Sequence, residues 1–346
     1  MSFPPRFLDE LRDRTALVDL IGRKVSLQRR GREHTGLCPF HKEKTPSFTV
    51  NEEKGFYHCF GCGQHGDAIS FVMETESLSF PEAVEILANA NGMEVPRATP
   101  EEVQREKRRG GLLEAVEAAT AWFERRLRGP EGKVALDYFT RRGLDSETIT
   151  KFRLGYAPVL GRGEASRLSA DLIQQGFEIE ALVEAGLLNV PEDGRAPYDF
   201  FRGRAMFPIT DRRGRVIAFG GRVIGDGEPK YLNSRDTPLF DKRRTLYNLA
   251  NAREACRDAP EMIVAEGYMD VIALDRGGFP AAVAPLGTAL TEEQIEALWK
   301  LVDEPLLCFD GDNAGRRAAG RAADRALPLL KPGKSLRIAF MPHGED

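Results

Sequence analysis

Two short stretches, Cys38-Pro39-Phe40-His41 and Cys59-Phe60-Gly61-Cys62, place four metal-binding side chains in two pairs. Two residues separate the ligands within each pair, a gap that lets one tight turn direct both ligand atoms at the same ion. Two such turns complete a tetrahedron, and a mixed set of thiolates and one imidazole suits Zn²⁺. Four protein ligands leave no open coordination position. We therefore predict one structural zinc ion held by Cys38, His41, Cys59 and Cys62.

Other interpretations of these residues explain less of the pattern. A thioredoxin-like Cys-x2-Cys pair accounts for Cys59 and Cys62 but gives no role to Cys38 and His41. The structural alternative is two buried cysteines beside a loop histidine. Three further histidines lie nearby in the sequence, but none pairs with Cys38 at the required spacing: His34, His58 and His65.

The same region is rich in aromatic residues with lysines between them. A module this small needs few rings for its core, so we expect some rings to lie on the surface beside cations and to offer stacking faces for bases. The alternative is that all of them pack around the zinc-bearing strands. The rings are Phe40, Phe48, Phe56, Tyr57 and Phe60, and the lysines are Lys42, Lys44 and Lys54.

The chain has 346 residues, of which 42% are hydrophobic and 29% are charged, and it is long enough for two or three domains. Its N-terminus runs directly into charged residues, so we expect no signal peptide. No apolar run reaches the roughly 18 residues of a membrane span, so we expect no contact with a membrane. Because three of the five cysteines are assigned to zinc, the sequence indicates a reducing compartment and a cytoplasmic protein.

The distribution of charge is more informative than its sum. A net charge of −4 by itself argues weakly against nucleic-acid binding. The basic residues, however, are concentrated in two stretches, 21–65 and 195–244, and acidic residues gather elsewhere. Local basic surfaces in a mildly acidic chain are typical of proteins that bind phosphates at particular places.

Apolar spacing predicts the elements around the zinc motif. Residues 7–20 have helical spacing, 47–50 and 55–58 are typical of hairpin strands, and two helices follow, at 67–74 and from Ser79 to about Gly92. Residues 97–111, with a charged run at 101–109, are the best linker candidate, either as a flexible tether or as a solvated helix face. A further helix is expected at 112–127.

The pattern changes toward the C-terminus. Between 201 and 246 glycine, β-formers and basic residues predominate. From Glu261 onward short apolar strands alternate with helices, which predicts a parallel sheet covered on both faces. The strands are expected at 262–265, 281–284, 306–309 and 336–341, and the helices at 267–274, 291–302 and 313–330. We therefore expect a multidomain α+β and α/β chain, with a zinc module, a basic mixed region and a parallel α/β sheet.

Two strands of the predicted parallel sheet end in carboxylates. Glu266 follows one strand, and Asp310 and Asp312 follow another. The functional crevice of an open α/β sheet lies at the carboxyl ends of its strands, and three carboxylates that meet there need a divalent cation, above all Mg²⁺. Such a cluster fits two-metal phosphoryl transfer. The structural alternative is that Asp312 only caps a helix and Glu266 is a surface residue.

A carboxylate centre that handles nucleotides also needs cations for the phosphates. Contacts from Lys and Arg to phosphate give affinity without sequence information. A single arginine is usually only a surface charge, but a high density of basic residues with glycines and aromatics between them indicates a phosphate-binding surface. Four such stretches precede the acidic sheet: 201–204, 220–222, 229–234 and 241–244.

These motifs together resemble those of bacterial replicative DNA primases of the DnaG type, over essentially the whole chain. The resemblance rests on the order and combination of the motifs, because the acidic ones alone are shared with topoisomerases and some nucleases through the Toprim fold. The stretches that carry it are residues 38–48, 59–63, 201–209, 230–234, 266–270 and 310–315.

The resemblance implies a zinc-ribbon template-binding domain at 1–96, a linker at 97–111 and an RNA polymerase core. The core would contain a basic N-terminal subdomain at 112–258 and a Toprim subdomain at 259–346. Two or more catalytic Mg²⁺ or Mn²⁺ ions would be held by Glu266, Asp310 and Asp312, with Asp346 as a further ligand, Asp270 in support and Lys230 beside them in catalysis. The nucleotide and template groove would be lined by Arg142, Arg202, Arg204, Arg222, Lys230, Asn233 and Lys242.

The implied activity is nucleotidyl transfer by a DNA-dependent RNA polymerase. It would join ribonucleoside triphosphates into short RNA primers de novo on single-stranded DNA at the replication fork, leaving an RNA–DNA hybrid. The implied partner is the replicative helicase, through a C-terminal domain absent from this chain. Family members continue beyond residue 346 with a second acid and a helical subdomain, so we expect this chain alone to bind metal weakly and to synthesise poorly.

Two other functions stay open on the sequence. A Toprim nuclease or topoisomerase is the first: a nuclease would need no NTP site, and a topoisomerase would need a nucleophilic tyrosine in a separate domain, which the sequence does not recognisably supply. A non-catalytic zinc-ribbon DNA-binding protein is the second, and the intact set of Glu266, Asp310 and Asp312 argues against it.

Overall fold

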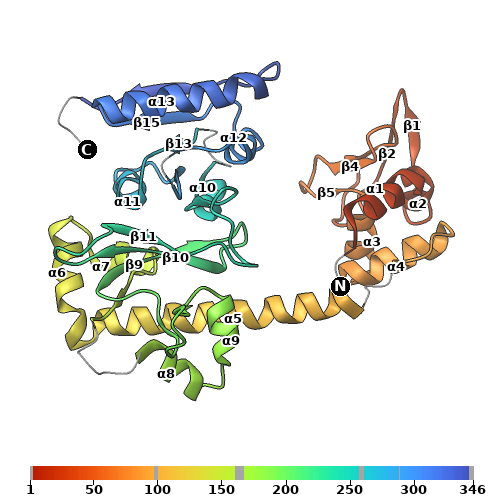
Figure 1. Ribbon diagram of the computed structural model, residues 1–346. Coiled ribbons are helices and arrows are strands. Elements are labelled where there is room, and N and C mark those ends of the chain that lie inside the picture. Colours follow the sequence, from red (N-terminus) through yellow and green to blue (C-terminus); the bar gives the residue numbers. More distant parts are fainter. Residues whose placement is uncertain (1–2, 97–99, 160–166, 257–260, 288, 343–346) are drawn as a thin grey trace. The chain divides into compact units, whose positions relative to one another are not determined.

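The computed structural model describes residues 3–96, 100–159, 167–256, 261–287 and 289–342 (Figure 1). Asp346, the further metal ligand that the resemblance implies, lies outside the described residues. The chain divides into two compact units, Met1–Arg105 and Glu106–Asp346, which we describe separately. Within the described ranges, no helix has both the length and the apolar character needed to cross a lipid bilayer.

An antiparallel five-stranded sheet forms the first unit together with four helices. The sheet order is β1-β2-β3-β4-β5, so strands that are neighbours in sequence pair through short turns. The strands are β1 (Gln28–Arg30), β2 (Glu33–Gly36), β3 (Phe48–Asn51), β4 (Phe56–Cys59) and β5 (His65–Gly66). The helices are α1 (Pro5–Arg14), α2 (Leu17–Gly22), α3 (Ala68–Glu76) and α4 (Phe80–Ala90). β3 and β4 confirm the predicted hairpin.

The helix predicted at 7–20 is two helices. α1 ends at Arg14 because Thr15 has extended backbone angles (φ −87°, ψ 106°), and its hydroxyl donates to the carbonyl oxygen of Leu11 over 2.7 Å. The break lets Leu11 and Ile21 both reach the core, where they are fully buried. α3 begins where predicted, because the side chain of Asp67 caps it by accepting a hydrogen bond from the N–H of Ser70.

A single 29-residue helix, α5 (Pro100–Arg128), carries the chain into the second unit. It contains most of the predicted linker, and the charged run at 101–109 is helical and largely exposed, as in the interpretation of this run as a solvated helix face. Phe123 of α5 has its ring centroid 5.2 Å from that of Phe219, so the C-terminal half of α5 packs against the sheet that contains Phe219.

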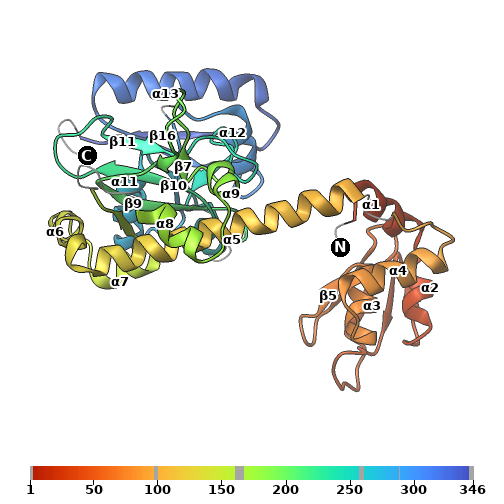
Figure 2. The same cartoon turned by 60° about the horizontal axis from the view of Figure 1, so that its bottom comes forward.

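That sheet is antiparallel and has the order β11-β10-β9-β6, beside a separate β7-β8 pair (Figure 2). The strands are β6 (Gly155–Ala157), β7 (Leu188–Asn189), β8 (Tyr198–Asp199), β9 (Arg204–Thr210), β10 (Val216–Val223) and β11 (Tyr231–Asn233). The helical elements are η1 (Pro130–Gly132), α6 (Lys133–Arg141), α7 (Ser146–Lys151), α8 (Arg167–Gln174) and α9 (Ile179–Glu184). We call this the basic sheet.

The C-terminal sheet has the order β12-β14-β13-β15-β16, and only β12 runs antiparallel to its neighbour. The predicted parallel sheet is confirmed, and β12 was not predicted. α11 and α13 lie on opposite faces of it (Figure 1). The strands are β12 (Leu246–Tyr247), β13 (Ile263–Val264), β14 (Ala282–Pro285), β15 (Leu306–Phe309) and β16 (Arg337–Phe340). The helical elements are α10 (Leu249–Ala255), α11 (Tyr268–Arg276), α12 (Glu292–Trp299), α13 (Asn313–Ala326) and η2 (Leu327–Leu329).

Candidate functional site

The four predicted zinc ligands meet at one point of the first unit. The ligand atoms of Cys38, His41, Cys59 and Cys62 all lie within 4.8 Å of one another. Sγ of Cys38 is 3.8 Å from Sγ of Cys62, and Sγ of Cys59 is 3.8 Å from Nδ1 of His41. A tetrahedron with metal–sulfur bonds of about 2.3 Å has edges of about 3.8 Å, so the arrangement fits a tetrahedral zinc shell.

Glu43 orients His41 from the side that faces away from the cysteines. Its Oε2 lies 3.3 Å from Nε2 of His41, which leaves Nδ1 toward the metal position. Its Oε1 accepts hydrogen bonds from the backbone N–H groups of Cys38 (2.7 Å) and Ser47 (3.1 Å). A carboxylate on the second nitrogen of a ligating histidine fixes its tautomer and raises its basicity. No spacing pattern in the sequence indicates this role for Glu43, although the residue lies within the stretch 38–48 that carries the family resemblance.

The two buried thiols of this cluster differ in pKa. Burial raises the pKa of Cys38 to about 12. Burial also acts to raise the pKa of Cys59, but hydrogen bonds from Ser47 and from the backbone N–H groups of Cys62 and Gly61 outweigh it, and the pKa is lowered to about 7. Because only thiolates bind the metal, Cys38 must release its proton on binding. Zinc affinity is therefore expected to fall as the pH falls.

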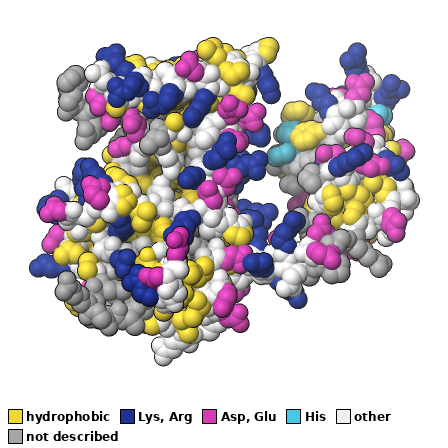
Figure 3. Space-filling view, in the orientation of Figure 1, with side chains coloured by type: hydrophobic (Ala, Val, Ile, Leu, Met, Phe, Trp, Pro, Cys, Tyr) yellow, Lys and Arg dark blue, Asp and Glu magenta, His cyan; other side chains and the backbone are white. Residues whose placement is uncertain are grey.

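Two of the five aromatic rings named above lie on the surface, as predicted. Phe60 is 76% exposed and Phe56 is 39% exposed, whereas Phe48 and Tyr57 are fully buried. The ring of Phe60 packs against the ring of His58, with centroids 4.5 Å apart. Hydrophobic and histidine side chains accordingly lie side by side on the surface of the first unit in Figure 3.

In the second unit, the pairing of β13 with β15 brings Glu266 and Asp310 together. Val264 is the register partner of Leu307, so the carboxyl ends of both strands emerge at the same edge. The backbone N–H of Asp310 donates a 3.0 Å hydrogen bond to Oε1 of Glu266. The sequence therefore correctly placed these two residues at neighbouring strand ends.

Asp312 stands at the N-terminus of α13, close to Asp310. Its Oδ1 accepts a 2.7 Å hydrogen bond from the N–H of Gly315, so Asp312 does cap this helix. The cap occupies one of its two carboxylate oxygens. A Cβ atom at Gly315 would lie 2.1 Å from the carbonyl oxygen of Asp310, so only glycine allows α13 to begin this close to the acidic loop.

The negative charges near Glu266 affect its protonation. Partial burial is the largest cause that raises the pKa of Glu266, and the charges of Asp310, Asp270 and Asp312 add to it, against the hydrogen bond from the Asp310 N–H. A divalent cation would relieve this repulsion. In the described part of the chain, only the Cys/His cluster brings three or more ligand atoms within 4.8 Å of one another. A cation at the acids would therefore also need oxygens from water or substrate, as Mg²⁺ commonly does.

Asp270 supports the turn that follows Glu266. Its Oδ2 accepts a 2.8 Å hydrogen bond from the N–H of Gly267, the N-cap of α11. The acid at the third position of the helix thus closes the first turn and fixes the backbone next to Glu266. This placement fits the supporting role that the resemblance implies for Asp270.

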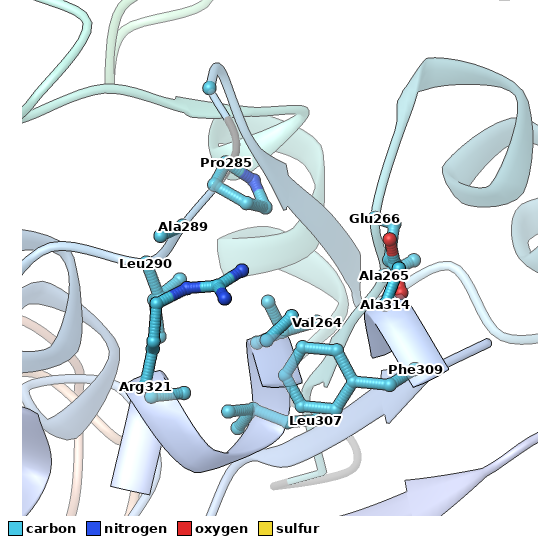
Figure 4. A pocket seen from close by; sticks show the side chains of 13 residues that line it. Val264, Ala265, Glu266, Pro285, Ala289, Leu290, Leu307, Phe309, Ala314 and Arg321 are labelled. Atoms are coloured by element: carbon cyan, nitrogen blue, oxygen red, sulfur yellow. The ribbon is translucent and has the colours of Figure 1, made fainter. Parts of the chain in front are cut away.

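A pocket of about 400 Å³ opens beside Glu266 (Figure 4). Its walls are mainly apolar and come from β13, β15, α13 and the loop after β14, with Val264, Leu307 and Phe309 among them. The side chain of Arg321 extends over it from α13. Apolar walls reduce the water around Glu266, which is consistent with burial as the main cause of its raised pKa.

Two of the predicted groove arginines converge on one aromatic ring. Cζ of Arg222 lies 4.5 Å from the ring centroid of Tyr138, and Cζ of Arg142 lies 5.9 Å from it. The N–H of Val223 donates to the carbonyl oxygen of Lys230, which brings the backbone of the exposed Lys230 next to the end of β10. We call Arg142, Arg222 and Lys230, which lie around this end of the basic sheet, the cationic edge.

Asn233 and Lys242 lie in the wall of a second pocket, of about 810 Å³. Three arginines share this wall: Arg235, Arg243 and Arg325. Arg243 belongs to the basic stretch 241–244, whereas Arg235 and Arg325 lie outside the four predicted phosphate-binding stretches and carried no signal of their own in the sequence. Lys and Arg side chains are visible around the hollow of the second unit in Figure 3.

Arg202 and Arg204 have different environments, although the sequence suggested one role for both. Arg202 is exposed, and its Cζ lies 4.7 Å from the ring centroid of Tyr198. Arg204 is only 6% exposed, and its Nη1 donates to the carbonyl oxygens of Gly221 (3.0 Å) and Pro229 (2.9 Å). Arg204 therefore holds β10 and the loop before β11 in place, and we do not count it among the groove residues.

The fold and the sites define a class of protein with a zinc ribbon, a basic mixed subdomain and a Toprim-type sheet that carries carboxylates at its strand ends. Three families match successive parts of the chain: the CHC2 zinc finger at residues 3–103, the N-terminal domain of the DNA primase catalytic core at 122–253 and the Toprim domain at 261–339.

Named relatives agree with these matches. The DNA primase of Pseudomonas putida is 48% identical over 346 residues, which cover 99% of this chain and 52% of that protein. The crystal structure of a DNA primase domain from Pseudomonas aeruginosa is 48% identical, with a TM-score of 0.63 over 68% of this chain and 72% of that chain. A DnaG primase catalytic domain bound to ssDNA is 40% identical, with a TM-score of 0.62 over 70% of this chain and 76% of that chain.

The chain belongs to the DnaG-type DNA primase family. It spans about half the length of the Pseudomonas relatives that it matches.

Proposed function

We propose that this chain is the part of a DNA primase that binds single-stranded template and joins ribonucleotides into an RNA primer. The observation that carries the proposal is the position of the carboxylates beside the cations. The pocket next to Glu266 and the basic pocket next to Lys242 share Gly287 and Ala289 in their walls, so the two sites adjoin. Family membership and the related catalytic domain bound to ssDNA support the same function.

The donor atoms suit two kinds of metal ion. Three cysteines and a histidine suit one structural Zn²⁺. Carboxylates suit hard cations, and we propose that Glu266, Asp310 and Asp312 hold catalytic Mg²⁺ or Mn²⁺, joined by Asp346 as the resemblance implies. When bound, these ions would activate the attacking hydroxyl group and neutralise charge on the triphosphate.

The chain's own cations hold the phosphates in this proposal. Arg142, Arg222 and Lys230 form the edge along which the template and nucleotide phosphates bind, and Lys242 faces the adjoining pocket. Lys230 is exposed at the end of this edge, where its ammonium group stabilises the charge that develops on the leaving pyrophosphate. A fixed cation is effective here because it requires no reorganisation during the reaction.

The zinc ribbon contributes a surface for bases in this proposal. The exposed rings of Phe56 and Phe60 offer stacking faces, and stacking tolerates every base. From the family resemblance alone we also propose that the protein works at the replication fork with the replicative helicase, through sequence outside these 346 residues.

A synthesis assay tests the proposed function. The chain is incubated with a single-stranded DNA template, Mg²⁺ and labelled ribonucleoside triphosphates, without a primer and for long enough to register slow synthesis. We expect labelled RNA whose formation depends on the template. A nuclease would instead shorten labelled DNA without nucleotides, and a non-catalytic binding protein would bind the DNA and form no product. Either result would contradict the proposal.

A further inference from the structure

Tyr268 connects the parallel sheet to the basic sheet close to Glu266. It is the first residue of α11, two positions after Glu266, and its side chain is buried. Its hydroxyl donates a 2.6 Å hydrogen bond to Oδ1 of Asn233 on β11. Nδ2 of Asn233 donates a 2.8 Å hydrogen bond to the carbonyl oxygen of Leu286, just after β14. The side chain of Asn233, on the basic sheet, thus holds two segments of the parallel sheet: the turn after β13, through Tyr268, and the loop after β14, through Leu286.

The ring of Tyr268 is held in one position by its neighbours. It stacks on Phe207 of β9, with centroids 5.2 Å apart and an interplanar angle of 13°, and it meets the edge of Tyr247 at 4.8 Å. Gly220 of β10, the register partner of Asn233, lies against the same ring. A Cβ atom at Gly220 would be 2.4 Å from Cζ and 2.5 Å from the hydroxyl oxygen of Tyr268. Glycine at this position lets the hydroxyl reach Asn233.

The backbone next to Glu266 therefore has two anchors. Asp270 holds the N–H of Gly267 within α11, and Tyr268 holds the same turn to the basic sheet. Phosphates bound along the basic sheet must meet the ions at Glu266 with correct geometry, and a displacement of about 1 Å between reacting groups can cost two orders of magnitude in rate. A link between the two sheets at this point controls that geometry.

We propose that Tyr268 is a positioning residue for nucleotidyl transfer. Through Asn233 and Leu286, its hydroxyl sets the position of the acidic strand ends relative to the cationic edge formed by Arg142, Arg222 and Lys230. Asn233 makes one hydrogen bond in this link with each of its polar atoms, so we assign it a positioning role. The inference rests on the proposed function and adds residues to that same site.

The first test separates turnover from binding. Tyr268→Phe, Asn233→Ala and the double variant are compared with the parent chain in RNA synthesis on single-stranded DNA. Tyr268→Phe is expected to lower kcat about fivefold, the effect of losing one net hydrogen bond, and Asn233→Ala, which loses two, at least as much. The double variant should be no slower than the slower single variant. The KM for nucleotides and the Kd for the template should stay within about twofold of the parent values.

Tyr247→Phe is the matched control. It removes a buried hydroxyl that has no hydrogen-bond partner among the described residues, from a ring that also packs on Tyr268. Its kcat should stay within about twofold of the parent value. A raised KM with unchanged kcat in Asn233→Ala would overturn the inference, because it would show contact with the nucleotide. Equal losses in Tyr247→Phe and Tyr268→Phe would also overturn it, because packing alone would then explain both.

Thermal unfolding of the same variants tests the link without relying on catalysis. Tyr268→Phe should melt about 2–4 °C below the parent and Asn233→Ala at least as far below it, with the double variant no lower than the less stable single variant. Additive shifts would show that the two side chains are not linked, and would overturn the inference. If the parent makes no RNA, the proposed function fails and the positioning role fails with it, while the thermal series still decides whether the link between the sheets exists.

Discussion

Oε2 of Glu43 lies 3.3 Å from Nε2 of His41, and Nδ1 of the same imidazole lies 3.8 Å from Sγ of Cys59. The ring therefore stands between the carboxylate and the metal position. Because Oε1 of Glu43 also holds the backbone of Cys38, one side chain that is not a ligand fixes both ligands of the first zinc-binding turn. The geometry of the site depends on this residue as well as on the four ligands.

Glu43→Gln should weaken zinc binding. The amide keeps the shape of the side chain but loses the charge that makes the His41 imidazole more basic, and changes of this kind typically cost about 10–100-fold in metal affinity. Competition with a chromophoric chelator at neutral pH measures the effect. Glu53→Gln, at an exposed position of the same unit, is the control. Equal zinc affinities for the two variants would show that Glu43 does not act on the site.

Removal of zinc should unfold the first unit and leave the second unit folded. The first unit has a small hydrophobic core that includes two of the zinc ligands, Cys38 and Cys59, so metal binding and folding are expected to be coupled. Cys38→Ser should lower the zinc content measured by elemental analysis, and unfolding should then show a separate transition at lower temperature. Cys256→Ser, in the second unit, should retain zinc. A folded first unit after chelation would contradict this expectation.

Asp312 should show two separable effects. Asp312→Asn keeps a side chain that caps helices well but removes the charge, so stability should stay near that of the parent while RNA synthesis is lost. Asp312→Ala removes both the helix cap and the negative charge. It should abolish RNA synthesis and also lower the free energy of unfolding by about 1 kcal/mol. Urea unfolding and the synthesis assay measure the two effects. Asp324→Asn, exposed on the same helix, should change neither. An active Asp312→Asn variant would refute the metal-binding role.

The stability of the β9–β10 hairpin should depend on pH through Asp211. Burial acts to raise the pKa of Asp211, but hydrogen bonds from the side chain of Arg215 and from the N–H groups of Arg213 and Arg215 outweigh it and lower the pKa. A lowered pKa in the folded state means that the contribution is present above the ordinary pKa of about 4 and is lost as the pH falls below it.

Asp211→Asn measures this contribution directly. At pH 7 the variant should be less stable than the parent by about 1 kcal/mol, the size of one partly exposed charged hydrogen bond. The difference should shrink as the pH falls from about 4 toward 2, because the parent carboxylate is then protonated as well. Thermal unfolding at several pH values is the measurement, and a difference that stays constant or grows in acid would contradict it.

The candidate metal ligands could be proposed from the sequence because their signals are local. Cys38 and His41 belong to one turn, and Glu266 and Asp310 each follow an apolar strand directly, so spacing alone singles them out as candidates. The partners of these residues were not predictable in the same way. Tyr268 meets Asn233 across 35 positions of sequence, and only the folded chain shows that their polar atoms bond.

Burial was the other property that sequence could not supply. Arg204 and Arg222 come from similar basic, glycine-rich stretches, yet Arg204 is buried against backbone carbonyls while Arg222 lies at the cationic edge. The charged run at 101–109 could have been a tether, but it continues into a helix whose C-terminal half is buried against the core, and it is helical with it. For Arg204, neighbours distant in the sequence decide the environment. For residues 101–109, the helix that continues beyond them decides the conformation.

The most direct test of the account is RNA synthesis by the parent chain and by Asp310→Ala, measured beside their affinity for single-stranded DNA. The account predicts that the parent forms template-dependent RNA from labelled nucleotides without a primer. It predicts that Asp310→Ala forms none, although its Kd for DNA stays within about twofold, because the carboxylate serves the reaction and the cationic edge holds the template. Synthesis by Asp310→Ala at the parent's rate would contradict the account.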